Sequence, residues 1–173
     1  MRRLFFQALV NSALTEPLGH ADAELADLAS RLSQTTRARL GRSLSIRELD
    51  AGSCNGCELE INALSNAFYD LERFGLRFVA SPRHADVLLV TGPVTKNMRD
   101  PLRRTYEAMS APKWVVAAGD CAIDGGCFAG SPVVLGAASQ IVPVDLVVHG
   151  CPPPPSSILR SLVSLMEQPI NPK

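Results

Sequence analysis

The stretch DVLLVTG, residues 86–92, is a near-continuous apolar run that ends at a glycine. Such a run is expected for a strand that is buried on both faces of a parallel sheet. A second run of this kind, KWVVAAG, occupies residues 113–119, and shorter strands are predicted at 45–49, 76–81 and 144–150. Helical patterns separate these strands, at 59–73, 97–110 and 155–168. This alternation predicts an α/β fold with a mostly parallel sheet and helices on both of its faces.

The first 45 residues differ from the rest of the chain. Residues 21–40 predict an amphipathic helix with leucines at near-helical spacing, and Gly41 marks its end. The apolar stretch LFFQALVNSAL, residues 4–14, is expected to be a core helix or an arm that contacts a partner, with an anchor at a membrane surface as the sharper alternative. We therefore expect an N-terminal helical extension, 1–45, that contacts a partner or a membrane surface, followed by an α/β domain, 46–173.

Composition excludes several classes of function. The 173 residues include 17 basic and 17 acidic side chains, so the chain lacks the positive charge expected of a nucleic-acid-binding protein. A net charge near zero also suggests a subunit of an assembly, because charge keeps free monomers soluble. No apolar run approaches the roughly 20 residues of a membrane-spanning helix. Arg2 and Arg3 precede an apolar stretch, but no small-residue cleavage site follows, so a cytoplasmic protein is expected.

Five cysteines are the residues most suggestive of chemistry: Cys54, Cys57, Cys121, Cys127 and Cys151. An odd number at irregular spacing, without an export signal, disfavours a disulfide framework and favours metal binding or redox chemistry. Three of the loops that carry them begin where a predicted strand ends. Because the carboxyl ends of parallel strands share one edge of a sheet, these loops are expected to converge. The four thiols other than Cys127 would suit tetrahedral zinc or a 4Fe-4S cluster.

The residues beside the cysteines bear on this choice. The Asn-Gly pair between Cys54 and Cys57 permits a tight turn, and Gly119 lets the backbone approach a bulky group near Cys121. Structural zinc sites usually combine two closely spaced ligand pairs, whereas the last two thiols here are about thirty residues apart. A thioredoxin-like dithiol would fit the first pair but would leave Cys121 and Cys151 unexplained. Both alternatives remain open on the residues alone.

Four blocks together resemble a known family: GSCNGCELEI at 52–61, SPRHADVLLVTGPVT at 81–95, AAGDCAIDGGCF at 117–128 and VHGCPPPP at 148–155. The set resembles the small subunit of membrane-bound, energy-converting NiFe hydrogenases of the formate hydrogenlyase type. It is also similar to the 20-kDa subunit of respiratory complex I, the NADH:quinone oxidoreductase. The resemblance covers about residues 46–166. The CxxC block favours the hydrogenase side, because the complex I subunit carries adjacent cysteines there.

The resemblance implies a flavodoxin-like α/β domain that carries a single, proximal-type 4Fe-4S cluster. By motif, its ligands are Cys54, Cys57, Cys121 and Cys151, and Cys127 matches no ligand position. The chain would be an electron-transfer subunit of an oxidoreductase complex and would hold no catalytic residue of its own. Implied partners are a NiFe-hydrogenase-like large subunit, a ferredoxin-like iron–sulfur subunit and integral membrane subunits, with the complex on the inner face of the cell membrane. The alternatives are a quinone-reducing, complex I-like subunit and a structural subunit without hydrogen chemistry.

Four residues beside the ligands are candidates to tune the cluster: Gly56, Glu58, Glu60 and Asp120. Hydrogen bonds, burial and nearby charge set the potential of an iron–sulfur cluster. Glu58 and Glu60 could also move protons at a subunit interface. The plainer interpretation is that acidic residues favour the first turn of a helix for electrostatic reasons.

Overall fold

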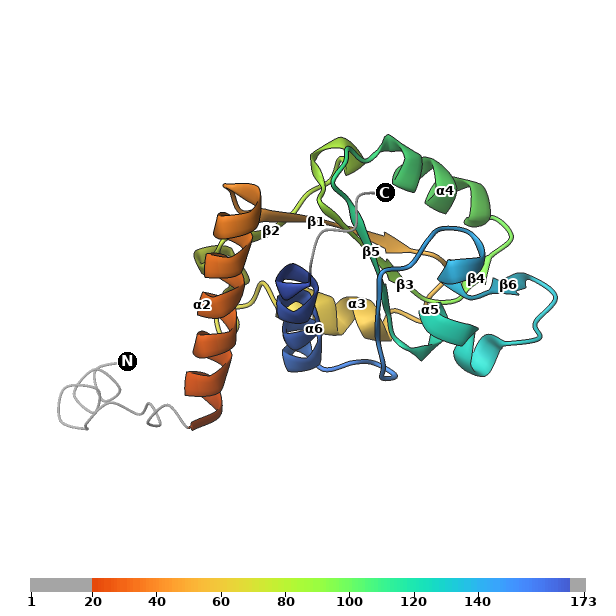
Figure 1. Ribbon diagram of the computed structural model, residues 1–173. Helices are drawn as coiled ribbons and strands as arrows, with labels where there is room; N and C mark the ends of the chain where they lie inside the picture. The colour runs from red at the N-terminus through yellow and green to blue at the C-terminus, as the bar shows by residue number, and fades with distance from the viewer. Residues whose placement is uncertain (1–19, 169–173) are drawn as a thin grey trace, which may run out of the picture.

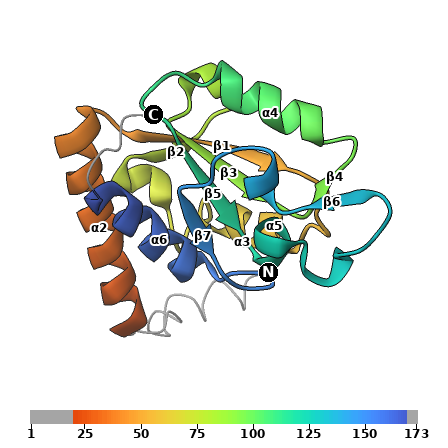
Figure 2. The ribbon, with the colours of Figure 1, turned by 45° about the vertical axis from the view of Figure 1, so that its right-hand side comes forward.

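The computed structural model describes residues 20–168 and is built on a parallel sheet. Its five strands run in the order β2-β1-β3-β5-β7, and every neighbouring pair is parallel (Figures 1 and 2). The strands are β1 Leu44–Asp50, β2 Leu76–Phe78, β3 Val87–Thr91, β5 Trp114–Ala118 and β7 Leu146–Val148. A separate antiparallel ribbon joins β4 Val94–Thr95 to β6 Val134–Gly136. The predicted α/β class and parallel sheet are confirmed.

Helices cover both faces of the sheet (Figures 1 and 2). The α-helices are α2 His20–Leu40, α3 Gly56–Ala63, α4 Arg99–Ala108, α5 Asp120–Asp124 and α6 Pro155–Glu167. Short 3-10 turns are η1 Leu71–Phe74, η2 Pro82–His84, η3 Gly126–Phe128 and η4 Ala138–Gln140. Helices α2, α3 and α6 contribute to one hydrophobic cluster, whereas α4 and α5 contribute to the other. The sheet therefore separates two cores, as the near-continuous apolar strands predict.

Strand β3 shows how one sequence serves both cores. Its five residues are all buried, and the side chains of Val87 and Leu89 belong to the cluster with α2, α3 and α6. Leu88 and Val90 alternate with them and belong to the cluster with α4 and α5. Successive side chains of a strand point to opposite faces, so a strand between two cores needs apolar residues at every position.

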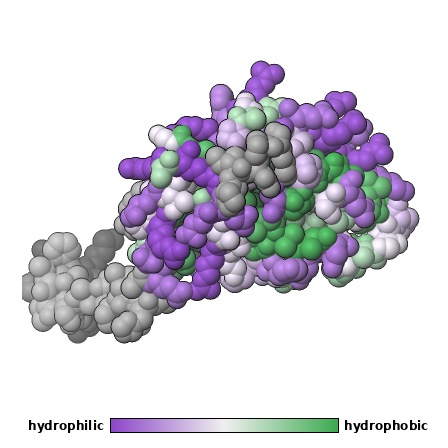
Figure 3. All heavy atoms as spheres, in the orientation of Figure 1, coloured by the Kyte–Doolittle hydropathy of each residue, from purple (hydrophilic) through white to green (hydrophobic). Residues whose placement is uncertain are grey.

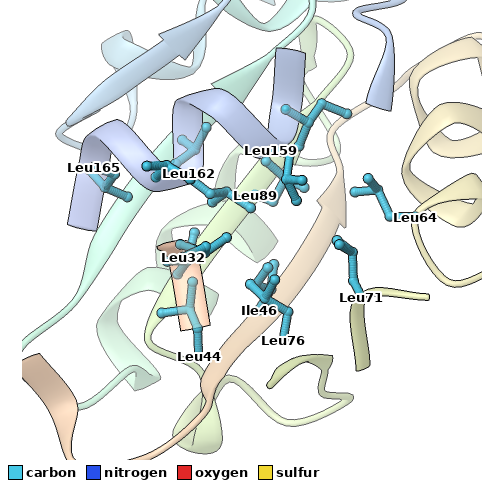
Figure 4. Close-up of a cluster of buried hydrophobic side chains, with 14 of the residues drawn as sticks. Leu32, Leu44, Ile46, Leu64, Leu71, Leu76, Leu89, Leu159, Leu162 and Leu165 are labelled. Carbon is cyan, nitrogen blue, oxygen red and sulfur yellow. The ribbon is translucent and has the colours of Figure 1, made fainter. Parts of the chain in front are cut away.

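Helix α2 is packed against the domain core. Leu32 is fully buried beside residues of β1 and α6 (Figure 4), and burial of one such side chain contributes roughly 1.5–3 kcal/mol. Arg39 donates from Nη1 to the carbonyl oxygens of Leu165 (3.0 Å) and Met166 (2.8 Å), and its guanidinium lies 4.9 Å from the ring centre of Trp114. Burial lowers the pKa of Arg39. Residues 20–40 thus share the core of the α/β domain.

The expected helix within residues 4–14 lies outside the described residues. The predicted end of α2 at Gly41 is confirmed: Gly41 has φ +68° and donates its N–H to the Arg37 carbonyl oxygen at 2.9 Å. The functional division of the chain at residue 45 stays a prediction.

The predicted helix 59–73 is too long, because α3 ends at Ala63. The side-chain oxygen Oδ1 of Asn66 accepts the N–H groups of Phe68 (2.9 Å) and Tyr69 (3.0 Å). This local hydrogen bonding competes with the helix ladder and turns the chain. The short ribbon of β4 and β6 was not predicted, because strands of two and three residues carry too little periodicity to detect.

The surface exposes large apolar side chains at Leu59, Phe68, Phe128, Val133 and Val147. Figure 3 shows apolar residues gathered toward the side of the molecule that carries α5 and the β4–β6 ribbon. Within residues 20–168, no helix combines the length and apolar composition that crossing a membrane requires.

Candidate metal centre at the carboxyl edge of the sheet

Four of the five cysteines line one pocket of about 70 Å³ at the carboxyl edge of the sheet. Cys54 follows β1, Cys57 is the second residue of α3, Cys121 is the second residue of α5, and Cys151 lies between β7 and α6. The residues around this space, here called the cysteine pocket, are Ser53, Cys54, Gly56, Cys57, Gly92, Asp120, Cys121, Gly150, Cys151 and Pro152. The structure thus brings together the four thiols that the sequence singles out.

The strand order explains why these loops meet. Order 2-1-3 at one end of the sheet makes the gap between β1 and β3 a topological switch point, where connections leave in opposite directions and a crevice opens. The loops that follow β1 and β3 contact each other at the base of this crevice. A Cβ built on Gly92 would lie 2.4 Å from the backbone nitrogen of Ser53, so only glycine fits there.

Glycines also face the buried sulfurs. A Cβ on Gly119 would lie 2.6 Å from Sγ of Cys57, and a Cβ on Gly126 would lie 2.7 Å from Sγ of Cys121. Both glycines have positive φ, +88° and +51°, which other residues rarely adopt. Gly56 is less crowded, since its Cβ would lie 3.5 Å from Sγ of Cys54. The backbone is therefore shaped around the sulfur positions.

Asp120 links two of the cysteine loops. Its Oδ1 accepts the N–H of Gly150 at 3.0 Å, and its own N–H donates to the carbonyl oxygen of Gly150 at 2.9 Å. His149 Nδ1 lies 3.5 Å from the same Oδ1, with most of the His149 side chain in solvent. This reciprocal pair, here called the Asp120–Gly150 latch, holds the loop of Cys121 against the loop of Cys151. The candidate Asp120 thus acts on loop position.

The two buried thiols are difficult to ionise in the absence of a cation. Burial raises the pKa of Cys57 to about 12, with further contributions from Glu58 and from the other three thiols. Burial likewise raises the pKa of Cys121 to about 11, followed by Cys127, Cys151 and Cys54. A helix start usually lowers a thiol pKa, but here burial and negative neighbours outweigh it. Since metals bind thiolates, a cationic group in the pocket would replace two protons.

Two carboxylates, Glu58 next to Cys57 on α3 and Glu48 on β1, influence each other electrostatically. Both side-chain oxygens of Glu58 and Oε1 of Glu48 are buried and lack a hydrogen-bond partner within the described part of the chain. Burial, then Glu58 and then Asp50, raises the pKa of Glu48 to about 7. Neither Glu58 nor Glu60 lines the pocket. Sequence reasoning missed Glu48, although a glutamate inside a predicted strand was a usable signal.

The four thiols are arranged around a cavity and do not converge on one point. Among residues 20–168, no three His, Cys, Asp or Glu side chains are grouped closely enough to hold a single metal ion together. The four thiols instead line the cysteine pocket together with Gly56, Gly92 and Gly150, which have no side chains to fill it. All five cysteines are free thiols in the structure.

Residues 54–165 match the protein family described as NADH ubiquinone oxidoreductase, 20 Kd subunit. The chain belongs to this family. The resemblance drawn from the four sequence blocks is confirmed, and so is membership of an oxidoreductase complex. The matched range contains all four thiols of the cysteine pocket.

Two curated relatives are hydrogenase subunits. The probable membrane-bound hydrogenase subunit mbhJ of Pyrococcus furiosus is 43% identical over 147 residues, which cover 85% of this chain and 87% of that protein. Formate hydrogenlyase subunit 7 of Escherichia coli is 43% identical over 136 residues, which cover 77% of this chain and 53% of that protein. The family member described here is thus similar to hydrogenase subunits through most of its length.

Two solved structures share the fold. A chain of the membrane-bound sulfane sulfur reductase, an archaeal respiratory membrane complex, superposes with a TM-score of 0.65 at 34% identity, over 80% of this chain and 74% of that one. A chain of an NAD+-reducing [NiFe]-hydrogenase gives a TM-score of 0.58 at 22% identity, over 76% and 96%. The second likeness shows the fold alone.

Proposed function

We propose that this family member is an electron-transfer subunit that holds one proximal-type 4Fe-4S cluster through Cys54, Cys57, Cys121 and Cys151. It relays electrons between the NiFe site of a large subunit and a ferredoxin-like subunit in a membrane-associated hydrogenase complex. The observation that carries the proposal is the cysteine pocket, in which four thiols from three loops surround one space. The 43% identity to two hydrogenase subunits supports the choice of complex.

The pocket supports a cluster over zinc and over a dithiol. A cavity that holds one water-sized particle needs only about 10–15 Å³. The cysteine pocket has a volume of about 70 Å³ between its four thiols, which is more than a single zinc ion requires. A dithiol formed by Cys54 and Cys57 alone would leave unexplained why Cys121 and Cys151 line the same pocket.

The chain's own residues hold and shield the group. When bound, the cluster supplies a site that accepts and gives up one electron at a time. Cys57 and Cys121 bind it from the buried side, and Cys54 and Cys151 bind it from the exposed side. The Asp120–Gly150 latch fixes the distance between two of these loops, while the glycines keep side chains away from the sulfurs.

The open side of the pocket supports a partner that covers it. Cys54 and Cys151 are exposed, and so are the apolar side chains of Leu59 on α3 and of Phe128 in the turn after α5. A NiFe-hydrogenase-like large subunit is the partner we assign to this side. Integral membrane subunits complete the complex, which places this chain at the periphery of the inner membrane face, in the cytoplasm.

Metal and sulfide analysis of the anaerobically purified chain tests the proposal. About four irons and four acid-labile sulfides per chain are expected, with an EPR signal after dithionite reduction. Replacement of any of the four pocket cysteines by serine should reduce the iron content. Zinc in place of iron, or a chain without metal, would contradict the proposal.

A second candidate function is electron transfer in a complex without hydrogen chemistry, whether quinone-reducing, sulfur-reducing or reliant on this subunit for structure alone. One observation favours it: the structural match to the sulfane sulfur reductase at 34% identity. Nickel analysis of the purified complex separates the two. Nickel in the large subunit, together with hydrogen evolution, would support the hydrogenase function. A complex that contains no nickel and reduces sulfur or quinone would support the second candidate.

A further inference from the structure

A second hollow lies on the surface between helix α4 and the turn η4. It has a volume of about 440 Å³ and shares no residue with the cysteine pocket. Helix α4 contributes to the core on the opposite face of the sheet from α2, α3 and α6 (Figures 1 and 2). The residues around this space, here called the α4 groove, are Arg99, Asp100, Arg103, Gln140 and Ile141.

Both walls of the α4 groove are anchored in the same hydrophobic core. Leu102 on α4 is fully buried, and so is Ala138 at the start of η4. Val142, which directly follows Ile141, is also buried, and all three anchors belong to the cluster that contains α4 and α5. The backbone around the groove is therefore held in place by the fold, so a partner does not have to order it.

Gln140 brings a neutral polar group to the α4 groove. A Cβ built on Gly136, whose φ is +120°, would lie 3.2 Å from both Oε1 and Nε2 of Gln140. Glycine at this position of β6 therefore leaves room for the amide. An amide both donates and accepts hydrogen bonds, so it can bind beside a charged group without adding charge.

The two arginines of the α4 groove are only partly neutralised by their own helix. They are four residues apart, so they lie on one face of α4, and both side chains are more than half exposed. Nε of Arg99 lies 3.2 Å from Oδ1 of Asp100, and Nη2 of Arg103 lies 3.8 Å from the same oxygen. Nε of Arg103 lies 4.0 Å from Glu107. Both contacts of Arg103 exceed the hydrogen-bond distance of about 3.2 Å, so they leave its five N–H donors available to a partner.

Helix stability alone does not account for this arrangement. Exposed ion pairs contribute little to stability, and a helix that used them only for that purpose would need one acid for each base. Residues 96–107 instead carry four basic and two acidic side chains, in a chain whose 17 basic and 17 acidic residues balance. The positive charge is therefore a local excess on this side of the molecule.

We propose that the α4 groove is a docking site for an acidic segment of a partner protein, in which Arg99 and Arg103 bind a carboxylate side chain of that partner. Guanidinium groups match carboxylates with two parallel hydrogen bonds, and Arg is favoured wherever such planar recognition is needed. Ile141, which is half-buried, offers apolar contact beside the charged pair. This docking site is separate from the cysteine pocket and stands whether or not that pocket holds a cluster.

Two other occupants fit the α4 groove less well. Anionic lipids attract uninterrupted clusters of basic residues, whereas Asp100 and Glu107 lie among the arginines of α4. Sites for small molecules are mostly apolar, whereas four of the five residues around this groove are charged or polar. A protein carboxylate uses both the directed donors and the preformed shape.

Carbodiimide cross-linking of the intact complex tests the proposal with the Arg103→Lys variant. The introduced amine forms an amide only with a carboxylate in contact with it, and mass spectrometry identifies that carboxylate. We expect a link to an aspartate or glutamate of another subunit. Arg104→Lys is the matched control, because Arg104 is exposed on the same helix but does not line the groove, and it should give no link to that residue. Links to Asp100 and Glu107 alone would overturn the proposal.

Charge reversal measures what the contact contributes to assembly. With Arg99→Glu and Arg103→Glu combined, retention of the cross-linked subunit on the affinity-purified complex should fall about tenfold or more, because repulsion replaces attraction. Arg104→Glu should retain that subunit as wild type does. Equal retention in the double variant and wild type would overturn the proposal, as would equal loss in Arg104→Glu. Arg103→Lys keeps the positive charge, so cross-linking tests the contact even if the double variant folds poorly.

Vesicle binding separates a protein partner from a lipid surface. The full-length chain is sedimented with vesicles of equal parts phosphatidylcholine and phosphatidylglycerol. The double variant and Arg104→Glu should sediment to the same extent if the groove serves a protein. Selective loss of vesicle binding in the double variant, without a cross-link to another subunit, would overturn the proposal in favour of a membrane surface.

Discussion

The cysteine pocket has a buried wall and an exposed wall, and they are built differently. Cys57 and Cys121 are 9% and 8% exposed, and each is the second residue of a helix with a glycine against its sulfur. Cys54 and Cys151 are exposed and sit in loops. The fold alone therefore determines the buried wall, whereas the exposed wall leaves its sulfurs open to solvent or to a partner.

Gly119→Ala should have the largest effect on stability and iron content, because it adds a side chain against the buried wall of the cysteine pocket. The added Cβ would lie 2.6 Å from Sγ of Cys57 at φ +88°. Backbone strain and overpacking together should lower the free energy of unfolding by about 2–4 kcal/mol, and most of the iron should be lost. Urea unfolding and iron analysis measure both.

Gly130→Ala is the matched control for this variant. Gly130 has a similar φ of +83°, but no atom lies within 4 Å of its Cβ position. Strain alone should lower stability by about 1–2 kcal/mol and leave the iron content unchanged. Equal loss of iron in both variants would show that backbone strain, and not the sulfur contact, explains the result.

Cys57→Ser and Cys54→Ser should respond differently to an external thiol. Both should bind less iron, but 2-mercaptoethanol in the reconstitution buffer should restore iron binding mainly in Cys54→Ser, whose position is open to solvent. The position of Cys57 is buried, so a small thiol cannot reach it. Iron content with and without the thiol measures the difference, and equal rescue would remove the distinction between the two walls.

Asp120→Ala should have an intermediate effect by breaking the link between the walls. The N–H of Gly150 would lose its acceptor at 3.0 Å, which costs about 1–3 kcal/mol for a shielded donor. Asp120→Asn retains a side-chain oxygen at the same place and should remain close to wild type. If both variants show the same unfolding free energy as wild type, the Asp120–Gly150 latch contributes nothing measurable.

Glu48→Gln should have the smallest effect, and the effect should depend on pH. The pKa of Glu48 is about 7 in the folded chain, compared with the ordinary value of 4.5. Between pH 4.5 and pH 7 the folded chain therefore keeps a proton on Glu48 that the unfolded chain has lost. Wild-type stability therefore falls as pH rises from 4.5 through 7. Because glutamine cannot ionise, the variant should gain on the order of 1–2 kcal/mol at pH 8, allowing for partial exposure.

The same variant at low pH is its own control. Below the ordinary glutamate pKa both states are protonated, so wild type and Glu48→Gln should have nearly equal stability. A constant difference across the whole pH range would mean that packing, and not ionisation, distinguishes the two side chains.

The sequence predicts the position of the pocket well, because the relevant signals are local. Apolar runs locate the ends of β1, β5 and β7, and the cysteines follow those ends directly. The difference between the two walls could not be predicted in this way, since it depends on which loop faces the core. The burial of the Glu48 carboxylate likewise depends on tertiary packing. The early end of α3 depends on one side chain, Asn66, competing with the backbone.

The Asp120–Gly150 latch has a consequence for affinity. Two loops that are far apart in sequence are held in register by the protein's own hydrogen bonds. Fixing a residue's backbone costs roughly 1–2 kcal/mol in conformational entropy, and for these loops that ordering belongs to folding instead of binding. Half of the ligand set is thus preorganised, so metal capture does not have to supply the cost of ordering the loops of Cys121 and Cys151.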